Sequence, residues 1–222
     1  MSKKVIILNA SPRKNYNTAR MLKEAQKGAE SVGAKVEYIN LVNLNYKGCM
    51  SCFACKRKGS TTNGLCALKD DLRPILEKCL NAGAVIMGSP IYFSYPTSLF
   101  RAFAERFMFP CYSYLKDEIN GGTKRILDKN IPIGLIYTMN CPEEGYNQRN
   151  YPVILGDNQE FLKKCFGYCE VLNVYYTLQF DDYSKYDSNT YDINHKKRYN
   201  DEQFPVYLEK AFDLGKRLVE IE

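Results

Sequence analysis

The feature that most constrains the fold is the start of the chain, where a short apolar run passes through a polar loop into a helical pattern. Val5–Leu8 are four consecutive apolar residues bounded by turn signals, which is typical of a buried strand in a parallel sheet. From Thr18 onward, apolar residues recur every three or four positions and predict a helix. The loop between them therefore lies at the carboxyl end of a strand and the amino end of a helix.

This loop has the chemistry of an anion site. The first N–H groups of a helix have no partner within it, and the helix dipole places partial positive charge there. Ser11, Asn17 and Thr18 add neutral donors, and Arg13 adds a charged fork that matches phosphate oxygens. The same residues would also suit an ordinary loop in which Asn17 caps the helix, so this segment alone leaves both interpretations open.

Length and composition indicate one globular unit. A chain of 222 residues with 45% hydrophobic and 25% charged residues can bury one substantial core. We expect a single domain over residues 1–222, with an insertion at about 110–130 and a C-terminal extension at about 181–222. No apolar run is long enough for a signal peptide or a membrane span, so we expect a soluble, cytoplasmic protein without a membrane partner.

Charge and side-chain chemistry exclude several classes of function. The net charge of +6 is scattered, and its densest run, Lys196–Arg198, is expected to form a solvated face. A mild positive field favours anionic ligands, and no nucleic-acid-binding motif accompanies it. The single histidine, His195, argues against two-histidine zinc sites and histidine-relayed nucleophiles. Nine cysteines without an export signal indicate a reducing compartment rather than a disulfide framework.

The chain alternates between strand and helix patterns. Further strands are expected at residues 35–40, near a sheet edge, and at 84–88, 131–137 and 171–180. Helices are expected after residues 71, 97 and 155 and near the C-terminus, and residues 143–155 are expected to form a long loop. Five strands alternating with helices predict an α/β fold, a doubly wound five-stranded parallel sheet in a three-layer α/β/α sandwich.

Three loops at the carboxyl ends of these strands carry binding chemistry: residues 9–18, 88–97 and 137–146. Ligands of doubly wound sheets bind at this edge, so the coincidence favours the anion site over a simple helix cap. The dinucleotide fingerprint and the phosphate-binding loop with its lysine are both absent. Flavin mononucleotide (FMN) fits a site of hydroxyls and amides for one phosphate. Tyr92 and Phe93 offer flat surfaces to its ring, unless they simply cover the sheet end.

Four motifs, in order along the chain, give a specific resemblance. They are Ser11-Pro12-Arg13 with Asn17-Thr18, Cys49-x-x-Cys52-x-x-Cys55, Cys66 with Lys69-Asp70-Asp71, and Gly88-Ser89-Pro90-Ile91-Tyr92-Phe93. The sequence resembles the flavodoxin-like NAD(P)H-dependent FMN reductase family, in particular its branch of iron–sulfur flavoproteins. The resemblance is strong over residues 3–140 and is limited to the helix and strand pattern beyond them.

The resemblance implies a set of FMN-binding residues. Ser11, Arg13, Asn17 and Thr18 would hold the phosphate, Pro90, Ile91, Tyr92 and Phe93 would lie along the ring, and Thr138 and Asn140 would lie near its far edge. It also implies assembly as a homodimer or homotetramer.

The cysteine motif has three interpretations. Cys49, Cys52 and Cys55 at a spacing of three, followed by Cys66, could ligate a [4Fe–4S] cluster. Ten residues separate Cys55 from Cys66, whereas the fourth cysteine comes sooner in the iron–sulfur branch. A zinc site with four cysteines and free thiols beneath the flavin loop are the alternatives. Three other cysteines fall on helical patterns and are expected in the core: Cys79, Cys165 and Cys169.

The function expected from these features is electron transfer through bound flavin. NAD(P)H would reduce FMN, which would pass electrons to a quinone, a nitro compound, free flavin or a protein acceptor. A different class is an electron carrier with a cluster and a flavin but no nucleotide oxidation of its own. A third is a flavin-dependent interaction or sensing protein without turnover.

Overall fold

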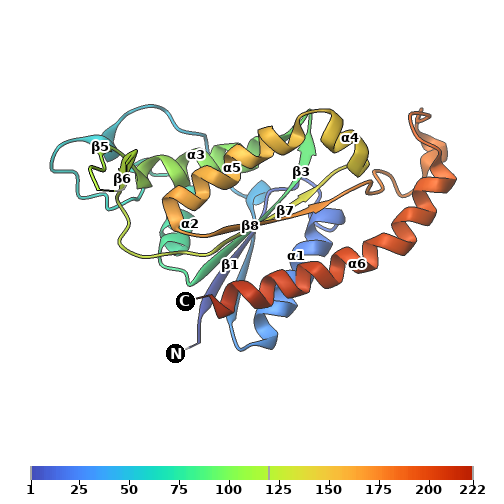
Figure 1. Ribbon diagram of the computed structural model, residues 1–222, viewed down its shortest axis with the longest axis horizontal. Helices are drawn as coiled ribbons and strands as arrows, with labels where there is room; N and C mark the ends of the chain where they lie inside the picture. Colours follow the sequence, from blue (N-terminus) through green and yellow to red (C-terminus); the bar gives the residue numbers. More distant parts are fainter. Residues whose placement is uncertain (1, 120, 222) are drawn as a thin grey trace.

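The computed structural model describes residues 2–119 and 121–221, and a central parallel sheet organises them (Figure 1). Its strands are β1 (Lys4–Asn9), β2 (Lys35–Asn40), β3 (Ala84–Tyr92), β7 (Ile133–Thr138) and β8 (Cys169–Val174). They lie in the order β2-β1-β3-β7-β8, all parallel, and β4 (Tyr95–Pro96) pairs antiparallel with the end of β3. This order confirms the doubly wound α/β fold, with its reversal between β1 and β3.

Helices cover both faces of the sheet, which gives the three predicted layers (Figure 1). One face carries α1 (Asn17–Ser31) and α6 (Ile193–Glu220). The other carries α2 (Leu72–Leu80), α3 (Ser98–Met108) and α5 (Tyr151–Phe166), with the short α4 (Glu143–Gln148) before α5. The described part of the chain also contains 3₁₀ turns at Leu41–Asn43, Ala54–Lys56, Phe109–Cys111 and Tyr183–Lys185.

The apolar runs of the central strands follow from this layering. Ile6 and Leu8 belong to the core beneath α2, α3 and α5, whereas Val5 and Ile7 belong to the core beneath α1 and α6. Successive side chains of a strand point to opposite faces, so a strand covered on both faces has to be apolar at every position. All four side chains are fully buried.

The helices α1 and α6 cross at very close range. A Cβ atom on Gly28 would lie 1.9 Å from the main-chain oxygen of Phe212, and one on Gly215 would lie 1.9 Å from the main-chain oxygen of Ala25. Two glycines at the crossing therefore let the helix backbones approach each other directly, while Leu214 and Leu218 of α6 pack on the sheet at Gly134.

The expected insertion and the expected long loop both contain regular structure. Residues 110–130 include a hairpin of β5 (Tyr112–Lys116) and β6 (Thr123–Arg125). Residues 143–155 were expected to be a loop, and that prediction is wrong because α4 and the first turn of α5 occupy them. Pro152 lies in the first turn of α5, where the missing N–H of proline has no helical partner to lose.

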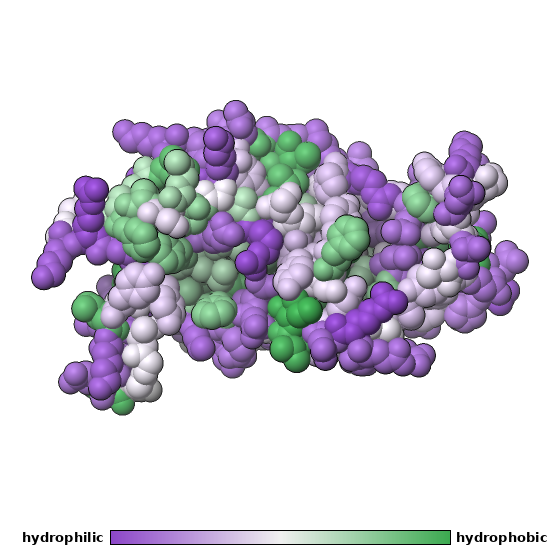
Figure 2. All heavy atoms as spheres, turned by 90° about the horizontal axis from the view of Figure 1, so that it is seen from above, coloured by the Kyte–Doolittle hydropathy of each residue, from purple (hydrophilic) through white to green (hydrophobic). Residues whose placement is uncertain are grey.

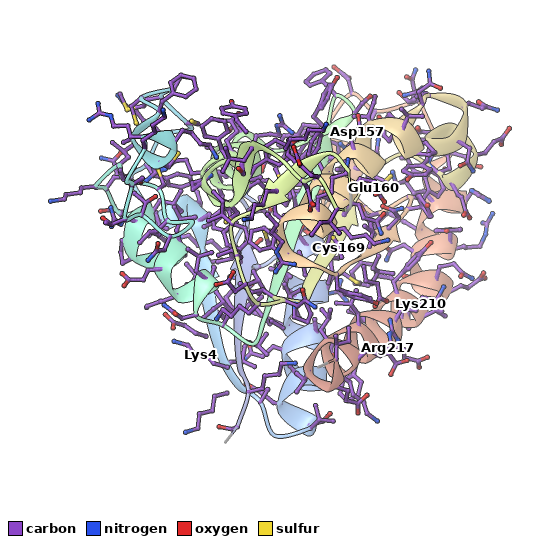
Figure 3. All side chains as sticks on the ribbon, turned by 60° about the vertical axis from the view of Figure 1, so that its left-hand side comes forward. Lys4, Asp157, Glu160, Cys169, Lys210 and Arg217 are labelled. Atoms are coloured by element: carbon purple, nitrogen blue, oxygen red, sulfur yellow. The ribbon has the colours of Figure 1, made fainter. Side chains whose placement is uncertain are left out.

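The last strand is shorter than expected. It begins at Cys169 and ends at Val174, and residues 175–180 continue without strand pairing, so the predicted range 171–180 is wrong at both ends. Cys169 is buried as expected, but it lies in this strand and not on a helix. Figure 3 shows it near Glu160 of α5.

None of the helices in the described ranges is both long and apolar enough to cross a membrane.

Candidate functional site

The β1–α1 loop is shaped by hydrogen bonds between side chains and its own backbone. The Oδ1 atom of Asn9 accepts from the Ser11 N–H at 3.0 Å, and the Oγ atom of Ser11 accepts from the Arg13 N–H at 3.1 Å. Asn and Ser side chains commonly form such turns. The Nδ2 atom of Asn9 also donates to Oδ1 of Asn40 at 2.9 Å, which ties the end of β1 to that of β2.

The amino end of α1 has no side-chain cap. The helix begins at Asn17, and the capping position is Tyr16, which makes no capping hydrogen bond. The interpretation of Asn17 as the cap is therefore wrong, and its Nδ2 atom donates instead to the main-chain oxygen of Leu178 at 2.7 Å. No acidic residue lies in the first turn, so the partial positive charge of the helix end is not balanced locally.

Hydrogen bonds join the three strand-end segments to one another. The hydroxyls of Thr18 and Thr138 lie 2.8 Å apart and connect the first turn of α1 to the end of β7. The hydroxyl of Thr97 donates to the main-chain oxygen of Ala10 at 2.7 Å, and the Thr97 N–H donates to Oγ of Ser89 at 3.0 Å. The loop after β3 is thereby fastened to the loop after β1.

A small cavity of about 50 Å³ opens where these loops meet. Nine of the ten predicted cofactor-binding residues line it: Ser11, Arg13, Asn17, Thr18, Pro90, Ile91, Tyr92, Thr138 and Asn140. Two further lining residues, Tyr16 and Met139, lie in the predicted loops 9–18 and 137–146, whereas three others lie outside every predicted loop: Thr177, Leu178 and Gln179. Among the described residues no carboxylate lines the cavity, although Asp181 hydrogen-bonds to Tyr16 on its wall.

Phe93 is the predicted residue that does not line this cavity. It lies at the tip of the β3–β4 hairpin with φ of +49°, and Ser94 follows with φ of +73°. A left-handed backbone suits this tight turn but is unfavourable for a bulky side chain. The Phe93 ring is 98% exposed and makes no aromatic contact within the described ranges.

The donors of Arg13 and Asn17 converge on one short stretch of chain. The guanidinium of Arg13 donates to the main-chain oxygen of Gln179, next to the Leu178 oxygen that Asn17 reaches. The same guanidinium lies 3.8 Å from the centre of the Tyr16 ring. Two acceptors one residue apart therefore each accept a hydrogen bond from this loop, one from Arg13 and one from Asn17. Residues 177–179 follow the last strand, and only the fold brings them here.

The basic run Lys196–Arg198 was expected to form a solvated face, and for Lys196 that prediction is wrong. Lys197 and Arg198 are exposed, but Lys196 is only 1% exposed and its ammonium donates to Asn140 at the cavity wall. Burial lowers the pKa of Lys196 from 10.5 to about 8. A basic run in a sequence predicts solvent-exposed lysines. Lys196 is buried instead because it contacts a loop more than fifty residues away in the chain.

The four cysteines of the motif line one cavity of about 330 Å³ at the opposite end of α3. Cys49 and Cys52 are exposed, and Cys55 and Cys66 are half-buried. Within residues 2–119 and 121–221, no group of three or more Cys, His, Asp or Glu side chains is placed so that it could hold a metal ion. The four thiols therefore line the same cavity, but they do not point toward one common position for a metal ion.

A second cavity beside the cysteine loop is apolar and open. It has a volume of about 420 Å³, and Phe53, Phe109, Tyr114 and Phe161 are among its walls. Phe53 and Phe161 are each 47% exposed and Tyr114 is 65% exposed. Figure 2 shows hydrophobic side chains gathered at this end of the molecule. This cavity lies apart from the one formed by the three strand-end loops, because the two have no lining residue in common.

The strand order and the position of the cavity define a flavodoxin-like α/β protein with its site at the carboxyl edge of the sheet. A NAD(P)H:quinone oxidoreductase from Methanothermobacter marburgensis has a similar fold, with a TM-score of 0.66 at 18% identity over 100% of this chain and 99% of that one. The chain belongs to the NADPH-dependent FMN reductase family, which it matches over residues 3–122.

The chain is also similar to proteins that are named iron–sulfur flavoproteins. An iron–sulfur flavoprotein of Methanocaldococcus jannaschii is 36% identical over 90 residues, which cover 40% of this chain and 44% of that protein. An iron–sulfur flavoprotein of Clostridioides difficile is 27% identical over 183 residues, or 74% of this chain and 78% of that protein. The match to the M. jannaschii protein therefore spans less than half of that protein's length.

Proposed function

We propose that this chain is an FMN-binding oxidoreductase that passes electrons from NAD(P)H through the flavin to a quinone, a nitro compound, free flavin or a protein acceptor. The observation that carries the proposal is the uncapped amino end of α1, where the donors of Ser11, Arg13, Asn17 and Thr18 surround one cavity without a carboxylate. Such a set of donors is suited to a terminal phosphate.

The donor chemistry fits the cofactor, and the cavity shows what has to change on binding. Arg13 and Asn17 now donate to the main-chain oxygens of Gln179 and Leu178. Phosphate oxygens would replace these two acceptors, so residues 177–179 would have to move partly out of the cavity. The exchange replaces neutral acceptors by charged ones, which form stronger hydrogen bonds.

The remaining lining residues would hold the ring. Pro90, Ile91 and Tyr92 offer main-chain groups and apolar surface along one side, and Thr138 and Asn140 offer polar groups at the far edge. Phe93, exposed at the hairpin tip, would cover the ring or the substrate from outside. When bound, FMN would supply the chemistry by accepting a hydride from NAD(P)H and releasing electrons to the acceptor, and the protein would position the ring.

An FMN titration of Arg13→Ala tests the phosphate site. Hydrogen bonds to charged groups contribute about 1.5–3 kcal/mol, so the variant should bind FMN at least about tenfold more weakly than the wild type. Lys14→Ala is the matched control, because Lys14 carries the same charge in the same loop but is exposed and does not line the cavity.

The same titration can refute the proposal. Wild-type protein that binds no FMN, or equal losses of affinity in Arg13→Ala and Lys14→Ala, would show that the phosphate is not held here. Anaerobic mixing of the loaded wild type with NADPH or NADH should bleach the flavin absorption, and adding a quinone should restore it. Bound flavin that neither nucleotide reduces would leave binding intact and contradict the oxidoreductase activity.

A second candidate is an electron carrier that also holds a [4Fe–4S] cluster at Cys49, Cys52, Cys55 and Cys66. The shared cavity of about 330 Å³ favours it, while the present spread of the thiols and the long spacing before Cys66 do not. Iron and acid-labile sulfide in anaerobically purified protein, both lost in Cys52→Ser, would establish the cluster. Their absence, with every thiol titrating freely, would leave flavin as the only redox group.

A further inference from the structure

Lys196 is a buried cation directly behind the wall of the cavity. It lies in the first turn of α6, is 1% exposed, and has no ion-pair partner among residues 2–119 and 121–221. Its Nζ atom donates to the main-chain oxygen of Asn140 at 3.3 Å and also to the Oδ1 atom of the same residue. Asn140 is a cavity-lining residue, so one side chain separates the ammonium from the ligand site.

Aromatic rings enclose the ammonium on its other sides. Nζ lies 4.6 Å from the centre of the Tyr176 ring and 5.0 Å from that of Tyr191. Tyr176 is itself 6% exposed, and its N–H donates to the main-chain oxygen of Cys141 at 3.0 Å, which fixes the ring against the loop after β7. Ring faces and neutral oxygens attract a cation, but they balance a buried charge less well than an anion does.

The contact also sets the polarity of the cavity wall. An ammonium has only donors, so it selects the carbonyl oxygen of the Asn140 amide and leaves the NH₂ group for other partners. Without Lys196, the side-chain amide of Asn140 could flip and point its oxygen toward the cavity. The lysine therefore keeps donors, and not acceptors, available at this end of the cavity.

We infer that Lys196 is a positioning residue that, through Asn140, makes the site bind a ring that has gained negative charge more tightly than the neutral ring. The inference rests on the proposed function, in which this end of the cavity faces the flavin ring. Transfer of a hydride from NAD(P)H to FMN yields NAD(P)⁺ and the reduced flavin anion, so one negative charge appears on the ring. The buried ammonium would then have an anionic partner, which residues 2–119 and 121–221 do not supply.

The test compares the affinities for oxidised and reduced FMN, measured by anaerobic titration and by the midpoint potential. In Lys196→Met the preference for reduced FMN should fall by about tenfold, which for a two-electron couple is a potential lower by about 30 mV. Affinity for oxidised FMN should change much less. Lys197→Met, the exposed neighbour, is the matched control and should leave the potential unchanged.

A pH series on the wild type and Lys196→Arg does not require the methionine variant to fold. Burial lowers the pKa of Lys196 to about 8, so its charge and the preference for reduced FMN should decline as the pH rises through 8. Arginine stays charged, so Lys196→Arg should keep the preference. The groups facing Nζ from other segments are Cys141, Tyr176 and Tyr191, and burial raises the pKa of each, which keeps them neutral in this range. On α6 itself, Asp192 caps the helix and is ionised throughout.

Three outcomes are distinguishable. The inference is supported by a lowered potential in Lys196→Met together with a preference for reduced FMN that declines with rising pH in the wild type but not in Lys196→Arg. Wild-type protein that binds FMN normally, with equal preference for reduced FMN in all variants and at all pH values, overturns the inference and leaves the proposed function intact. Wild-type protein that binds no FMN in either state overturns both.

Discussion

Arg106→Met is expected to lower the free energy of unfolding by about 3–5 kcal/mol, the cost of breaking a buried ion pair by removing one partner. The Arg106 side chain is fully buried, and its guanidinium forms two hydrogen bonds to the carboxylate of Asp70. It also donates to the main-chain oxygens of Lys47 at 3.0 Å and Leu68 at 3.1 Å. Methionine fills much of the same space but leaves Asp70 and both carbonyl groups without these donors.

Urea unfolding of the two proteins measures this loss, and Arg101→Met on the same helix is the matched control. Arg101 is exposed, and its guanidinium hydrogen-bonds to the side chain of Asn158, so its replacement should cost less than about 1 kcal/mol. Adding Asp70→Asn to Arg106→Met should restore part of the stability, because the unpaired carboxylate is then removed. Equal losses in the two arginine variants would show that the ion pair does not hold the fold.

The same pair gives the stability a predictable dependence on pH. Burial alone would raise the pKa of Asp70, but the hydrogen bonds and charge of Arg106 outweigh it and hold the pKa below its ordinary value. A carboxyl group with a lowered pKa in the folded state stabilises fully above its unfolded pKa of about 4, and the stabilisation is lost as the pH falls through the folded value. The difference between the wild type and Arg106→Met should therefore narrow in acid.

The ion pair also positions the cysteine loop. Arg106 fastens the chain after Cys66 to α3, and the carboxylate of the neighbouring Glu105 accepts from the Cys49 N–H at 3.1 Å on the other side of the loop. Cys66 faces the guanidinium. Both ends of the loop are therefore held by one turn of α3, and the thiols should become more reactive toward alkylation in Arg106→Met.

The second large effect is expected from Gly28→Ala, which should destabilise the protein by about 2–3 kcal/mol. The new Cβ would lie 1.9 Å from the main-chain oxygen of Phe212, and a backbone atom of α6 cannot turn aside as a flexible side chain can. The helices α1 and α6 would have to separate along the crossing. Because α6 also carries Lys196, we expect the variant to lose part of the preference for reduced FMN.

Gly156→Ala is the matched control for this change. Gly156 lies within α5, and a Cβ there would meet nothing within 4 Å. Alanine is favoured over glycine in helices by about 0.5–1 kcal/mol, so this variant should be slightly more stable than the wild type. Thermal and urea unfolding of both variants give the comparison. A stabilising effect of Gly28→Ala would mean that the two helices do not pack this closely.

The local sequence pattern was sufficient to predict much of the candidate site. The apolar run Val5–Leu8 is followed by donors that lie at the end of a central strand, as predicted, and the loops after β3 and β7 join them there. The failures occurred where local pattern is weak. Residues 143–155 are polar enough to read as a loop, yet α4 and α5 form there by packing Tyr146 and Tyr151 against the core.

The sequence by itself determined the alternation of strands and helices and the strand-end loops that carry the donors, because both follow from the spacing of neighbouring residues. Only the tertiary structure decided that Leu178 and Gln179 satisfy Asn17 and Arg13, and that Lys196 is buried behind Asn140. These contacts join residues far apart in the chain. Whether a charged side chain is buried depends on such distant partners, because its own neighbours in sequence are the same in either case.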